Sequence, residues 1–119
     1  MKENVKYWED SIISGITSYF KYGMDNDEYH SGDICHHSIP CLCVSEYPKS
    51  FQVICNTEFD IDSVQHVKDI KVVSFTIPEK YIHGFDKTDI PQLENIIRNS
   101  LKNINEQFKG KLIDYTYVS

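Results

Sequence analysis

The chain has 119 residues, with 12 Lys and Arg against 18 Asp and Glu, a formal net charge of −6, and 40 % hydrophobic residues. This size and composition predict a single α+β domain over residues 1–119, and they exclude a disordered chain. Its apolar runs are shorter than the roughly 20 residues of a membrane helix, and the charged N-terminus differs from a signal peptide. We therefore expect a cytoplasmic protein that does not bind a membrane.

The negative charge lies in the first half of the chain. Residues 1–62 carry 4 basic and 11 acidic side chains, whereas residues 63–119 carry 8 basic and 7 acidic ones. Arg98 is the single arginine, so the chain lacks the grouped cations that bind phosphate. Nucleic acid is thus excluded as the predicted ligand, while solubilising loops and a surface for a basic partner both remain open.

The first predicted element is an amphipathic helix over residues 5–20. Its apolar residues recur at steps of three and four, and Gly23 is expected to end it. The following residues, 24–33, are rich in acids and contain Gly32, which predicts a solvated loop.

A β-hairpin is predicted next, from strands at 38–46 and 51–59 joined by a four-residue turn containing Pro48. That turn length pairs residue 44 with residue 53. It places on the core face Phe51, Val53, Cys55, Leu42 and Val44, and on the opposite face Cys41, Cys43, Ile54 and Asn56.

The remainder of the chain adds two strands and a helix. Residues 61–69 lack a clean period and fit a short helix or a loop, whereas residues 71–77 alternate as a strand with Val73, Phe75 and Ile77 on one face. Pro78 ends that strand, and an aromatic loop is expected over 79–88.

A second amphipathic helix is predicted to begin at or just before Asp89 and to end at Gly110, with Pro91 in its first turn. A final strand over 111–118 completes the order α-β-β-β-α-β. This order predicts a mostly antiparallel sheet with two amphipathic helices packed on one face.

Metal-ligand residue types gather early in the chain. Zinc is the candidate ion, and the possible ligands are Cys35, His36, His37, Cys41 and Cys43. The spacing lacks a second pair of ligands such as CxxC, so small buried or half-buried thiols are the favoured interpretation and no cofactor is predicted. The cluster remains an alternative site for zinc or a small ligand.

Catalytic signatures are missing from the sequence. There is no phosphate-binding glycine loop and no GxSxG or HExxH motif. A Cys and His pair needs a positive setting to form the thiolate, and Cys35 has acidic neighbours. We therefore predict a protein that is not an enzyme, with a Cys/His hydrolase as a third alternative.

The leading hypothesis is a binding protein that uses acidic, tyrosine-bearing segments to neutralise a basic partner. Tyrosine is enriched at protein interfaces because it combines rigid apolar area with a hydroxyl group. The chain resembles small immunity proteins, antitoxins and phage-encoded inhibitors in its size and acidity, although no motif identifies a family. An immunity protein of a nuclease toxin is the specific hypothesis, and an inhibitor of a host defence protein is its alternative. The predicted partner-binding residues are Asp25, Asp27, Glu28, Asp33, Glu58, Asp60, Asp62, Tyr22, Tyr29 and Tyr47.

Overall fold

The computed structural model describes residues 5–24, 29–43, 50–62, 65–78 and 89–115. Within them the elements are α1 (Val5–Ser18), the π-helical turn η1 (Tyr19–Gly23), β1 (Ile34–Cys43), β2 (Phe51–Ile61), β3 (His66–Thr76), α3 (Asp89–Phe108) and β4 (Leu112–Asp114). The strands form one antiparallel sheet in the order β1-β2-β3-β4. This confirms the predicted α+β fold class and the order of its elements.

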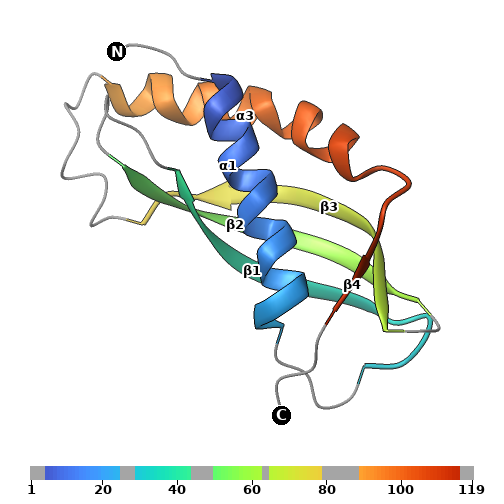
Figure 1. The fold of residues 1–119 in the computed structure, drawn as a ribbon. Helices are drawn as coiled ribbons and strands as arrows, with labels where there is room; N and C mark the ends of the chain where they lie inside the picture. Colours follow the sequence, from blue (N-terminus) through green and yellow to red (C-terminus); the bar gives the residue numbers. More distant parts are fainter. Residues whose placement is uncertain (1–4, 25–28, 44–49, 63–64, 79–88, 116–119) are drawn as a thin grey trace.

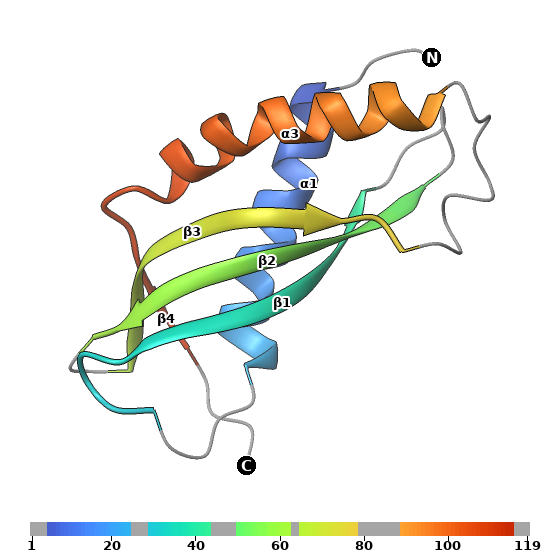
Figure 2. The ribbon, with the colours of Figure 1, turned by 180° about the vertical axis from the view of Figure 1, so that it is seen from behind.

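Both helices lie on the same side of the sheet, where α1 crosses its face and α3 runs along β3 (Figure 1). The apolar stripe of α1 is buried against the sheet, with the Trp8 ring edge-on to Phe51 at 5.5 Å and Phe20 edge-on to Phe59 at 4.7 Å. Figure 2 shows the opposite face, across which no described helix passes. The fold thus has one covered face, which holds the core, and one open face.

The predicted helices are confirmed. The first helix continues from α1 through η1 to Gly23, and Met24 is fully buried, so the predicted solvated loop does not begin at that residue. The second ends at Phe108, and Gly110 follows with a φ of 76°. Glycine is favoured there because it adopts the left-handed conformation that commonly follows a helix.

The hairpin strands are present, but the predicted register is wrong. Cys43 pairs with Phe51 and Cys41 with Val53, which is three residues away from the predicted pairing. A shift by an odd number turns the strand over. Cys41 and Cys43 are therefore fully buried while Leu42 is 56 % exposed, and Val44, like the predicted turn, lies outside the described residues.

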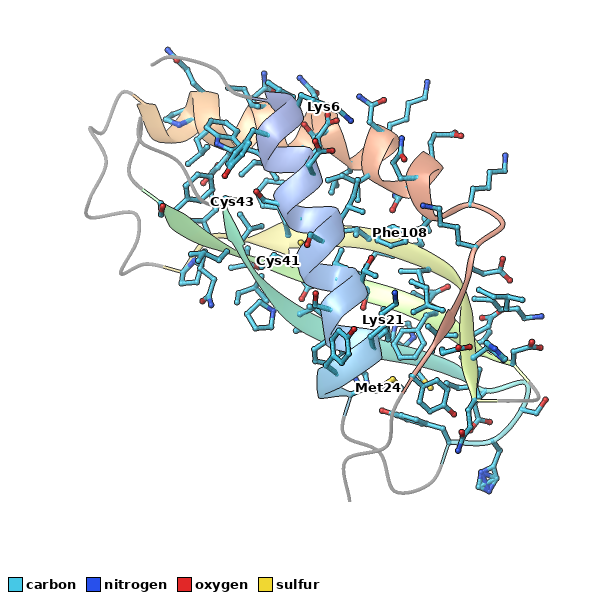
Figure 3. The ribbon with its side chains drawn as sticks, in the orientation of Figure 1. Lys6, Lys21, Met24, Cys41, Cys43 and Phe108 are labelled. Atoms are coloured by element: carbon cyan, nitrogen blue, oxygen red, sulfur yellow. The ribbon has the colours of Figure 1, made fainter. Side chains whose placement is uncertain are left out.

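Close packing of α1 on β1 accompanies this register. A Cβ placed on Gly15 would lie 3.1 Å from the Cys41 Sγ and 3.4 Å from the Cys41 Cα. Figure 3 labels Cys41 and Cys43 on the part of β1 that α1 crosses. A glycine on the helix and a small thiol on the strand let the two backbones approach each other.

The third strand begins earlier than predicted, at His66, so the helix or loop predicted over 61–69 is wrong at residues 61 and 66–69, which are in strands, while Asp62 and Gln65 lie between them. Two register shifts in the β2–β3 pairing interrupt the alternation, and Asp69 has a positive φ of 53°. Because a bulge adds one residue to a strand, it also changes which side chains face the core. Val72 is buried and Val73 is 48 % exposed, whereas Ile77, predicted to share a face with Val73, is buried.

The last predicted strand is present as β4, where Asp114 pairs with His66 and Leu112 with Lys68. Residues 116–118 of that prediction and the loop at 79–88 lie outside the described residues. None of the described helices is long and apolar enough to cross a membrane.

Candidate functional site

Acidic residues from three segments meet where β1 begins and β2 ends. Ile34 pairs with Asp60, the Ile61 amide donates to the Asp33 carbonyl oxygen at 2.9 Å, and the Gly32 amide donates to the Ile61 carbonyl oxygen at 2.9 Å. We call this region the acidic end of the sheet, and it consists of Asp33, Glu58, Asp60, Asp62 and Asp69. The first four are predicted partner-binding residues, so the fold brings together residues that are up to 29 positions apart in the chain.

A tight turn positions Asp33. The Asp33 amide donates to the His30 carbonyl oxygen at 3.0 Å, and the Asp33 Oδ2 accepts from the His30 amide at 3.0 Å. Gly32 has a φ of 89° at the third position of this turn, where a type II turn requires a residue that tolerates positive φ. The sequence Ser-Gly-Asp therefore holds the first acidic residue directly before β1.

Negative charge accumulates at this end. Burial raises the pKa of the Asp60 carboxyl, a hydrogen bond with Asp69 and the charges of Asp69 and Glu58 raise it further, and Lys68 opposes them. Lys68 also lies 4.0 Å from Asp62. One nearby lysine leaves several carboxylates without a close cation among the described residues, which favours an approaching positive charge.

The acidic end continues onto the open face of the sheet. Alternate residues of β2, including Glu58 and Asp60, are half-buried there. Beside them runs a hydrogen-bonded row in which the Ser38 hydroxyl donates to Asn56 at 2.7 Å and the Asn56 amide donates to Ser74 at 2.9 Å. This surface is polar and is held in place by three strands.

The tyrosines divide between surface and interior. Tyr22 is 76 % exposed on η1, whereas Tyr29 is half-buried and its hydroxyl is hydrogen-bonded to the His37 Nε2. Tyr47 and the acidic residues at 25, 27 and 28 (Asp25, Asp27 and Glu28) lie outside the described residues.

Sequence reasoning missed the group around His37. The Tyr19 hydroxyl is 2.5 Å from the His37 Nδ1, and the Phe59 ring packs edge-on against the imidazole at 5.2 Å. Because a neutral imidazole has one donor and one acceptor nitrogen, one tyrosine hydroxyl donates and the other accepts. Burial lowers the pKa of His37. No spacing along the chain signals this group, since its members come from η1, a loop and two strands.

The alternative metal ligands do not form one site. Successive strand residues point to opposite faces, so His36 lies on the open face while its neighbours Cys35 and His37 lie on the covered one. Cys41 and Cys43 are buried under α1, and burial raises the pKa of Cys43 to about 12. In the part of the chain that the structure describes, no group of three or more His, Cys, Asp or Glu side chains could hold a metal ion.

The setting of Cys35 also disfavours a thiolate. Burial raises the pKa of its thiol, and the charges of Asp33 and Asp60 raise it further. A thiol that stays protonated is a poor nucleophile.

Comparisons with protein-family models, with curated proteins and with solved structures found no match to this chain.

Proposed function

We propose that this chain is a non-enzymatic protein that binds and neutralises a basic protein partner, and that it acts as an immunity protein of a nuclease toxin. The observation that supports this proposal is the convergence of Asp33, Glu58, Asp60 and Asp62 at one end of the sheet. They project from strands and a hydrogen-bonded turn, so little ordering is needed when a partner binds.

A nuclease presents cations to bind phosphate, and the same cations suit a cluster of carboxylates. Electrostatic potentials of opposite sign on the two protein surfaces also speed their encounter, and the negative surface of this chain disfavours acidic partners. Repulsion between Asp60 and Asp69 is relieved when a lysine or arginine arrives, so the crowded carboxyls favour such a complex.

The test uses the basic product of a gene adjacent to the one that encodes this chain. Nuclease activity is measured with an equimolar amount of the chain, and the Kd is measured at low and high salt. We expect inhibition, weaker binding at high salt, and a loss of about tenfold in affinity when Asp33→Lys and Asp62→Lys are combined. Glu106→Lys, at an exposed position of α3, is the single-site charge control and should change affinity by no more than about twofold.

Two results would contradict the proposal. One is full nuclease activity in the presence of the chain. The other is a complex whose affinity is independent of salt and of the paired reversal at Asp33 and Asp62.

A further inference from the structure

The two edges of the sheet are protected in different ways. An edge strand presents unpaired backbone groups that can pair with another chain. β1, at one edge, contains Pro40, which is tolerated in edge strands because it donates no ladder hydrogen bond. The proline therefore interrupts the β1 edge as a template for a further strand.

The outer edge of β3 is covered over only part of its length. β4 pairs with residues 66–68. Further along, the Val72 amide donates to the Asn105 Oδ1 at 2.8 Å, and the Asn105 Nδ2 donates to the Val72 carbonyl oxygen at 3.1 Å. This side-chain amide of α3 takes the place of a neighbouring strand at one residue.

Beyond Val72, no pairing of this edge at residues 73–76 is found among the described residues. The alternation of an antiparallel ladder, adjusted for the bulge beside Val72, directs the amide and carbonyl of Phe75 outward as well. Phe75 can thus form two backbone hydrogen bonds with an added strand, one through its amide and one through its carbonyl group.

A groove of about 450 Å³ lies along residues 73–77 of this edge. Residues 73–77 line one side, and Glu94, Arg98 and Leu101 of α3 line the other. The strand side reads Val-Ser-Phe-Thr-Ile, which has high β-propensity and contains neither a charge nor a proline. This stretch lacks the residues that usually discourage strand addition.

Arg98 supplies a charged contact in the groove. It is exposed, and it forms no ion pair with any residue that the structure describes. A guanidinium binds a carboxylate through two parallel hydrogen bonds, so an Arg98 side chain without an ion pair among the described residues favours a ligand that carries a carboxylate.

We propose that the groove between β3 and α3 binds an extended, carboxylate-bearing peptide segment of a partner protein, which adds to the sheet as a strand beside residues 73–77. The backbone of the segment pairs with Phe75, its apolar side chains contact Val73 and Leu101, and its carboxylate pairs with Arg98. Strand addition next to a helix is a known mode of peptide recognition. This site is separate from the acidic end and does not depend on the function proposed above.

The test is a selection of random displayed peptides of about ten residues against the purified full chain, since strands span this length. Selected peptides are synthesised, and their affinity is measured by fluorescence anisotropy. Hydrogen exchange of the Phe75 amide is followed by NMR with and without peptide. Arg98→Glu is compared with Lys102→Glu, which makes the same charge change at an exposed position of α3 that does not line the groove.

We expect acidic peptides whose affinity falls about tenfold or more in Arg98→Glu, because hydrogen bonds between charged groups contribute that much. Lys102→Glu should change the affinity by no more than about twofold. Exchange of the Phe75 amide should slow when peptide binds. Circular dichroism checks that both variants are folded.

Four results would overturn the proposal. The selection could yield no binding peptide, or peptides that bind both variants equally. The Phe75 amide could be protected in the free protein as strongly as that of Val72, which would mean that the chain covers this edge itself. Sedimentation could show a dimer that dissociates in Val73→Lys, which would assign the edge to a second copy.

Discussion

Removal of the Asn105 side chain is the most direct test of how α3 and the sheet are held together. The side-chain amide of Asn105 accepts one hydrogen bond from the backbone of Val72 at 2.8 Å and donates another to it at 3.1 Å. Asn105→Ala breaks both. Each contributes about 1 kcal/mol, and alanine returns about 0.6 kcal/mol of helix propensity, so we expect a net loss of about 1.5 kcal/mol.

Urea unfolding measures this loss, and thermal unfolding should show a fall in Tm of about 6 °C for a domain of this size. Asn99→Ala is the matched control, because Asn99 is exposed on the same helix. Asn99→Ala should therefore raise the free energy of unfolding by the difference in helix propensity alone, about 0.6 kcal/mol. Equal stabilisation by the two substitutions would refute the assigned role of Asn105.

The pH dependence of Asn105→Asp gives an independent check. A carboxylate still accepts from the Val72 amide, but its second oxygen faces the Val72 carbonyl oxygen instead of donating to it. The folded state then favours the protonated acid, so the pKa of the introduced group rises above its unfolded value of about 3.9. Stability relative to the parent chain should be retained below that pH and lost as the pH rises. A variant whose relative stability is the same at every pH would contradict this geometry.

Three further predictions concern the core. Gly15→Ala should lower the free energy of unfolding by about 1 kcal/mol, measured in urea, because the close contact with Cys41 outweighs the better helix propensity. A stabilised variant would show that β1 shifts to accommodate the added methyl group. The lowered pKa of His37 means that the unfolded chain binds its proton more readily, so stability should fall as the pH drops below about 6.5, the unfolded value. Urea unfolding of His37→Gln should show a weaker dependence on pH, whereas His36→Gln on the open face should behave like the parent chain. In native alkylation followed by mass spectrometry, the half-buried Cys35 should react slowly and Cys41 only after unfolding, and rapid modification of Cys35 would revive the hydrolase alternative.

Much of the fold could be predicted from local patterns. Apolar residues at helical spacing located both helices, and Gly110 marked the end of the second. The positions of Glu58 and Asp60 on alternate residues of a strand placed both side chains on one face. These features depend only on the period of each element, which the order of residues specifies directly.

The register and the contacts between elements required the tertiary structure. A hairpin shifted by three residues keeps the same strands but places Cys41 in the core in place of Leu42. The bulge near Val73 in β3 likewise separates the buried Val72 from the exposed Val73. Helix coverage decides which face is buried, and that information is not local. The pairings of Asp60 with Asp69 and of Tyr29 with His37 likewise arise only when separate segments meet. Composition and periodicity therefore determined the elements and the acidic character of the chain, while long-range packing decided which side chains share a surface, because a one-residue offset reverses the face of a strand.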